Sequence, residues 1–88
     1  MKYKLIFSKR AQKQLYKLDR DTFNIITNWL NKNINGCEDP RAKGKALTAN
    51  RSGEWRYRIG DYRVIAEIHD KEVVILVVDA GHRSKIYD

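Results

Sequence analysis

The sequence predicts an α+β domain in which an N-terminal strand and an αα-hairpin precede an antiparallel β-meander, in the order β-α-α-β-β-β, with the helices packed on one sheet face. Two observations predict this class. Apolar residues recur at helical spacing between residues 9 and 33, and from Trp55 onward they alternate with polar residues in segments separated by tight turns. At 88 residues the chain is expected to form one domain, residues 1–88, around a modest core.

The first half of the chain contains the predicted N-terminal strand and both helices. Residues 3–7 (YKLIF) are a short strand candidate, free to join an edge of the sheet, and Ser8 is typical of an N-cap for a helix over residues 9–18. A second helix is expected to begin near Asp21 and to end within residues 33–36. The short connection between the two makes a helical hairpin.

A polar, basic loop is expected over residues 35–52, and a loop of this length in a small domain is usually functional or mobile. After it, Gly60–Asp61 is a two-residue turn signal. This turn pairs Ile59 with Tyr62 across the first two strands of the meander. The next pair of facing residues is then two arginines, Arg58 and Arg63.

The third strand of the meander, VVILVV, is expected to follow a second tight turn at Asp70–Lys71. This turn pairs His69 with Glu72 and places Val78 beside Arg63. The alternation then divides the side chains between two faces. The helices must cover Trp55, Tyr57, Val64 and Ile75 on one face. On the other face, three apolar residues are expected to be exposed: Ile65, Val74 and Leu76.

The net charge of +7, with all of the excess in residues 1–50, favours either a polyanionic partner or simple solubility. No apolar run approaches the roughly 18 residues of a membrane span, and the N-terminal apolar block is too short for a signal peptide. We therefore expect a cytoplasmic protein without membrane association. Cys37, the one cysteine, has no partner at a metal-binding spacing and is assigned no role.

The facing arginines, Arg58 and Arg63, predict an anion site, because like charges directly opposite each other destabilise a sheet unless something binds them. The last strand and the long loop bring further residues toward this pair: His82, Arg83 and Tyr87 from the C-terminal segment, and Lys43 and Lys45 from the loop. No carboxylate pair and no set of metal ligands accompanies them, so neither a metal nor another cofactor is expected.

The motifs GKAL, GEWRYRIGDYRVI and GHRSKIY, taken together, resemble the RelE-like toxins of the RelE/ParE toxin–antitoxin superfamily. The resemblance covers nearly the whole chain and implies the fold described above. It also implies a type II toxin that cleaves messenger RNA, often in the ribosomal A site, and that a RelB-like antitoxin silences in a hetero-oligomer. We expect an acidic segment of that antitoxin to fill or flank the face of Ile65, Val74 and Leu76.

RNA cleavage without a metal uses the substrate's 2′-hydroxyl, and it needs a base, an acid and positive charge near the phosphorus. By resemblance, Arg58, Arg63 and Arg83 supply the charge, and Tyr87 stacks on a base or assists proton transfer. His82 is a candidate acid or base because histidine titrates near neutrality. RNA or ribosome binding is assigned to Lys43, Lys45 and Arg56. By resemblance, Arg56 is also a candidate for proton transfer.

Asp79 departs from the pattern, because it adds a carboxylate just before the GHR motif, near Arg83. Two alternatives stay open. A ParE-like toxin would share the fold but bind DNA gyrase instead of cutting RNA. A nucleic-acid-binding module without catalysis would keep the charge but would not require His82 or Tyr87.

Overall fold

The computed structural model describes residues 1–86, and its elements follow the predicted order with two additions. Tyr87 lies outside the described residues. The additions, a two-residue strand and a 3₁₀ helix, lie inside residues 35–52, so the expectation of an unbroken loop there is wrong. The elements are β1 (Lys4–Phe7), α1 (Lys9–Tyr16), α2 (Arg20–Asn33), β2 (Lys45–Ala46), the 3₁₀ helix η1 (Ala49–Arg51), β3 (Trp55–Ile59), β4 (Tyr62–His69) and β5 (Val74–His82).

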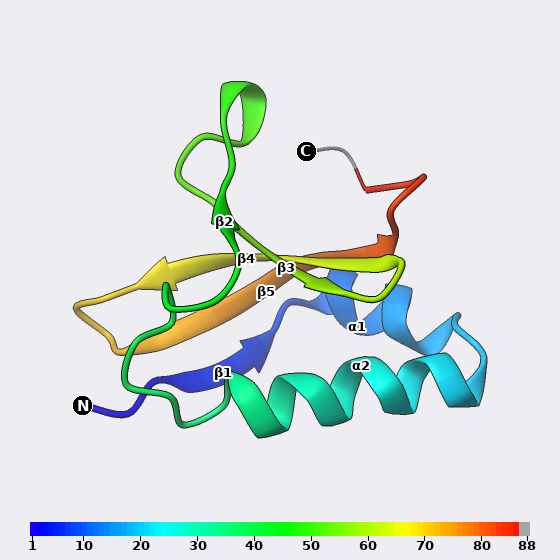
Figure 1. The fold of residues 1–88 in the computed structure, drawn as a ribbon, viewed down its shortest axis with the longest axis horizontal. Coiled ribbons are helices and arrows are strands. Elements are labelled where there is room, and N and C mark those ends of the chain that lie inside the picture. The colour runs from blue at the N-terminus through cyan, green and yellow to red at the C-terminus, as the bar shows by residue number, and fades with distance from the viewer. Residues whose placement is uncertain (87–88) are drawn as a thin grey trace.

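The strands form one five-stranded sheet in the order β1-β5-β4-β3-β2, and both helices lie on one side of it (Figure 1). The N-terminal strand joins the edge, as expected, but it pairs in parallel with β5, which makes the sheet mixed. All other neighbouring strands are antiparallel. No helix within residues 1–86 combines the length and the apolar character needed to cross a lipid bilayer.

Both helices begin at a side-chain cap. The Ser8 hydroxyl accepts a hydrogen bond from the backbone N–H of Ala11 (3.1 Å), which confirms the predicted start of α1. Asp19 does the same for α2 by accepting from the N–H of Thr22 (3.1 Å), so α2 begins slightly before Asp21. The Thr22 hydroxyl also donates to Asp19, and this bond lowers the pKa of the aspartate.

The main core lies between the helices and the sheet. Ile26 and Leu30 of α2 are fully buried against Tyr57, and Trp55 packs beside them, as the alternation predicted. The remaining buried members of this cluster come from every layer: Ala11, Leu15, Ile34, Ile59, Val64, Ala66, Ile75, Val77 and Ala80. Burying these side chains is the main stabilising term of the fold.

The pairing of β3 with β4 agrees with the prediction, because Arg58 faces Arg63 across the Gly60–Asp61 turn. The pairing of β4 with β5 does not. His69 pairs with Val74 instead of Glu72, because the chain makes a longer connection over residues 70–73 in which Val73 has a positive φ of 55°.

A second correction to the register follows from a β-bulge. The longer connection already shifts the pairing by two residues, and the bulge between Ile65 and Ala66 shifts it by one more, so Arg63 faces Gly81 instead of Val78. β5 also runs on to His82, so the GHR motif begins inside the sheet. Gly81 presents no side chain opposite Arg63, and a Cβ atom there would lie only 3.3 Å from the side chain of Ile86.

The face of the sheet opposite the helices carries a small second core. Ile65 was expected to be exposed, but it is fully buried because Leu47 and Ile86 cover it. Val78 packs against the same cluster. Val74 and Leu76 are half-buried on β5. The expectation of an open apolar sheet face at Ile65 is therefore wrong: the segment before η1 and the C-terminal segment fold over it.

Candidate nucleic-acid interface

A basic groove lies at the edge of the sheet where β2 meets β3. Its volume is about 200 Å³. Its lining combines one aromatic residue with four cations and a glycine: Trp29, Lys43, Gly44, Lys45, Arg56 and Arg58. Lys45 and Arg56 are paired across β2 and β3, so their side chains share the face of Arg58. The structure thus brings together all three predicted RNA-binding residues and one of the predicted catalytic arginines.

The loop before β2 is held in place by hydrogen bonds. The buried Tyr57 hydroxyl donates to the carbonyl of Pro40 (2.6 Å), and burial raises the pKa of this phenol. The indole N–H of Trp55 donates to the carbonyl of Lys43 (2.7 Å). These bonds fix the backbone that carries the two lysines, so the two aromatic residues support the basic groove as well as the core.

An exposed ion pair adds a further tie to the same loop. Arg41 binds Asp70 through two parallel hydrogen bonds of 3.0 Å, and Tyr3 donates to the same carboxylate (2.6 Å). Both contacts lower the pKa of Asp70, with Arg41 contributing most. The loop is thereby joined to the β4–β5 connection and to the N-terminus.

Gly44 is required where the loop crosses β3. Its φ is +85°, and a Cβ atom there would collide with the carbonyl oxygen of Arg56 and the indole nitrogen of Trp55. Any larger residue would push the two lysines away from the arginines.

The two central arginines are side by side. Arg58 is exposed and Arg63 is half-buried, and they face each other across β3 and β4 on the face opposite the helices. Adjacent like charges raise the local positive potential, which favours binding of a phosphate group.

The structure does not bring His82 to the arginine pair. His82 pairs with Tyr62, and the rings contact edge to face at 5.4 Å. Because neighbouring residues of a strand point to opposite faces, His82 shares the face of Tyr62 and not that of Arg63. Its Nδ1 accepts a hydrogen bond from the N–H of Ser84 (3.1 Å) and lies 2.9 Å from the Ser84 hydroxyl oxygen.

Arg83 lies at the end of the sheet that is closed by the β3–β4 turn. Its backbone N–H donates to the carbonyl of Asp61 (2.8 Å), and its side chain is exposed. The anchor places Arg83 near the turn that joins the two arginine-bearing strands. Tyr87, predicted to act beside it, falls outside the described residues.

Asp79 has a structural setting that the sequence analysis did not anticipate. It is 3% exposed, and it accepts hydrogen bonds from Gln14 (2.6 Å) and Arg51 (2.5 Å), with Arg10 at 3.5 Å. Gln14 also accepts from the N–H of Ala80 (2.9 Å). A carboxylate inside an apolar strand signals a buried partner, but nothing in the sequence identified Arg51 or Gln14 as that partner.

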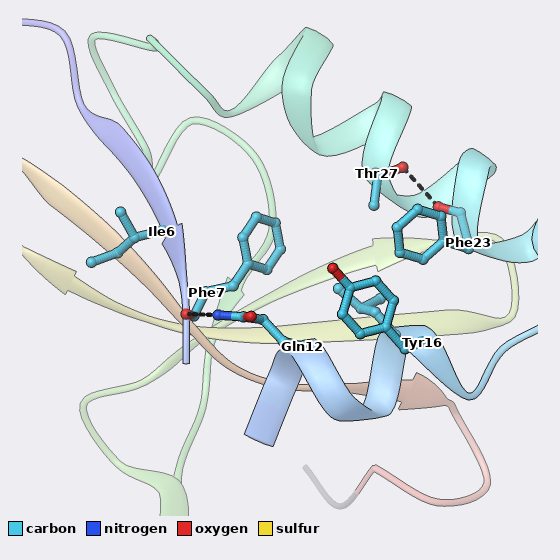
Figure 2. A pocket seen from close by; sticks show the side chains of 7 residues that line it. Ile6, Phe7, Gln12, Tyr16, Phe23 and Thr27 are labelled. Carbon is cyan, nitrogen blue, oxygen red and sulfur yellow. Dashed lines mark hydrogen bonds between the residues drawn. The ribbon is translucent and has the colours of Figure 1, made fainter. Parts of the chain in front are cut away.

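The structure also shows a second surface that sequence reasoning missed, an apolar groove between the β1 edge and the two helices (Figure 2). Its volume is about 440 Å³. Tyr16, which is 74% exposed, stacks on Phe23 with ring centroids 5.8 Å apart. The groove is lined by Ile6, Phe7, Gln12, Leu15, Tyr16, Phe23 and Thr27. The helical spacing predicted which side of each helix is apolar, but it did not predict that a groove remains between the helices and β1.

Comparisons with known proteins show which proteins this chain resembles in sequence and in fold. Toxin RelG of Mycobacterium tuberculosis is 25% identical over 87 residues, covering 99% of this chain and 98% of RelG. A chain of the toxin–antitoxin complex RelBE2 of the same organism has a TM-score of 0.85 at 23% identity, covering 94% of this chain and all of that one. The isolated E. coli RelE toxin gives 0.72 at 24% identity, covering 91% and 83%.

The fold is therefore that of the RelE-like toxins, a five-stranded mixed sheet with two helices on one face. The model of a family described as "ParE toxin of type II toxin-antitoxin system, parDE" matches residues 5–87. The chain belongs to this family, as a RelE-like toxin of the RelE/ParE superfamily.

Proposed function

We propose that the chain is a metal-independent endoribonuclease that inhibits translation by cleaving messenger RNA in the ribosomal A site. The observation that carries this proposal is the pairing of Arg58 with Arg63, next to Lys45 and Arg56 on the same face of the sheet. Such a concentration of cations suits a phosphate whose negative charge increases during reaction.

The chemistry requires no group beyond RNA and side chains. The 2′-oxygen attacks phosphorus as its proton leaves, the bond from phosphorus to the 5′-oxygen breaks, and that oxygen takes up a proton. The products are a 2′,3′-cyclic phosphate and a 5′-hydroxyl. In this proposal Arg58, Arg63 and Arg83 stabilise the pentavalent phosphorane, since a guanidinium binds two phosphate oxygens at once. The proton-transfer roles of His82 and Tyr87 stay predictions.

Gyrase inhibition is the second candidate, and the family's own description, which names ParE, favours keeping it. One experiment separates the two. In an in vitro translation reaction with the purified toxin, we expect messenger RNA cut at discrete positions, mapped by primer extension. In a parallel supercoiling assay, we expect gyrase to keep its activity. Intact messenger RNA together with inhibited gyrase would instead support the ParE-like function.

We further propose that the cognate partner is a RelB-like antitoxin and that it occupies the apolar groove rather than the face of Ile65. Complexes named as toxin–antitoxin pairs are among the structural neighbours. Lys9 and Lys13, which lie within one helical turn of Gln12 and Tyr16, are exposed beside the groove. An acidic amphipathic segment complements both the apolar lining and these charges.

The groove is tested by Ile6→Asp, because Ile6 is 38% exposed in its lining. A buried carboxylate in the interface should weaken antitoxin binding at least tenfold, about 1.4 kcal/mol, measured by calorimetry. Ile25→Asp is the matched control, since Ile25 is 60% exposed on α2 and does not line the groove. Equal affinities for the two variants, both shown to be folded by circular dichroism, would rule out this docking site.

A further inference from the structure

Among the described residues, Trp29 is the one lining residue of the basic groove that neither carries charge nor belongs to the segments predicted to bind RNA. It lies on α2, half-buried, with its ring 6.1 Å from that of Tyr57 and tilted by 50°. The core thus holds the indole on one side while the indole lines the groove. A tryptophan held in this way loses little conformational entropy when a ligand packs on it.

Among residues 1–86, no acidic side chain lines the groove, and its charged lining residues are all cations. Cationic side chains beside an aromatic ring are the combination that binds single-stranded nucleic acid, because cations bind the phosphates and every base has a face that stacks. The volume of about 200 Å³ is below the roughly 300–1,000 Å³ of drug-sized ligand sites. It fits a single nucleotide unit rather than a folded RNA.

The local topology leaves this site open to a strand of RNA. β2 pairs only with Trp55 and Arg56, so within the described sheet the outer edge of β3 beyond Arg56 has no neighbouring strand. The groove lies where β2 begins, between the loop at Gly44 and α2. A chain that runs along this edge meets Lys45 and Arg58 on the way to Arg63.

We propose that Trp29 and the basic groove form a subsite for one nucleotide of single-stranded RNA, with the base stacked on the indole. Its phosphates contact Lys43, Lys45, Arg56 and Arg58. The subsite rests on the proposed ribonuclease function and adds to it a base-binding residue on the helical layer. It makes Trp29 a determinant of how the RNA strand is positioned relative to the arginine pair.

The test measures binding of a single-stranded 2′-O-methyl oligoribonucleotide, which lacks the nucleophilic hydroxyl and stays intact. Trp29→Leu should weaken binding about tenfold, whereas Trp29→Phe, which keeps a stacking face, should stay within about threefold of the wild type. The salt dependence should be unchanged in Trp29→Leu, while Lys45→Ala should lower its slope by about 0.7. Ile25→Ala, on the same helix but outside the groove lining, should bind like the wild type.

A second arm changes the RNA instead of the protein, so that a fold defect in Trp29→Leu does not decide the result. Oligonucleotides with one abasic position are scanned against the wild type, and one position should reproduce the loss seen with Trp29→Leu. Combining that position with Trp29→Leu should cause no further loss. Additive losses, or equal binding by the leucine and phenylalanine variants, would overturn the subsite alone. Failure of the wild type to bind or cleave RNA at all would overturn both the subsite and the proposed function.

Discussion

Arg58→Ala should lower the single-turnover rate of messenger RNA cleavage by about 100-fold, which corresponds to about 2.7 kcal/mol of transition-state stabilisation. The reason is its position: it is exposed, opposite Arg63, and in the lining of the basic groove. Ribosome binding should change far less, because other cations of the groove stay in place. Arg58→Lys should recover only part of the rate, since an ammonium keeps the charge but loses the two-pronged hydrogen bonding.

The same measurement applies to Arg83→Ala, for which a loss of at least tenfold is expected. Arg20→Ala is the control for a lost positive charge, because Arg20 is exposed at the start of α2 and outside the groove lining. Growth arrest on expression should follow the cleavage rate through the series. If Arg58→Ala and Arg83→Ala still arrest growth fully while messenger RNA stays intact, the ribonuclease proposal fails and gyrase becomes the better target.

Asp79→Ala should lower the free energy of unfolding by about 3 kcal/mol, because removing one member of a buried ion pair leaves its partners without compensation. Asp79 is 3% exposed, and the side chain of Arg51 is 24% exposed. The loss is large relative to the roughly 5–15 kcal/mol typical of a folded domain. Urea unfolding should show a lower midpoint with an unchanged slope.

Arg10→Ala is the matched control for this network. The Arg10 side chain is 69% exposed and 3.5 Å from Asp79, so its removal should cost less than about 1 kcal/mol. If the urea midpoint of Asp79→Ala equals that of the wild type, the carboxylate contributes nothing to stability. The interaction with Arg51 would then be no more than a surface contact.

Caps and turns, which depend on residues close together in the sequence, were predicted correctly where those residues are typical of them. Ser8 marked the start of α1, and the Gly60–Asp61 turn was sufficient to pair Arg58 with Arg63. The β4–β5 register was not predictable in this way. Val73 adopts a positive φ that its residue type disfavours, so the sequence offered no reason to end the turn there.

The sequence predicted which kinds of residue the site contains, but it did not predict how all of them are arranged in space. Lys43, Lys45 and Arg56 were expected together and lie together, because one strand pairing determines their positions. The face of His82 and the burial of Ile65 follow from contacts with residues far away in the sequence. Ile65 is covered by Leu47 and Ile86, whose positions show no periodicity that would have indicated it.

The strand order also bears on how the molecule is synthesised. β5 is the last strand to leave the ribosome, yet it lies between β1 and β4 in the finished sheet. A chain that stops before Val74 leaves β1 without its one neighbour in the described sheet and Arg63 without its partner on β5, Gly81. Because β5 follows the other described strands in the chain and yet lies inside the sheet, the nascent chain cannot complete this sheet before Val74–His82 has left the ribosome. The complete toxin fold therefore forms only after the segment that carries β5 has been made.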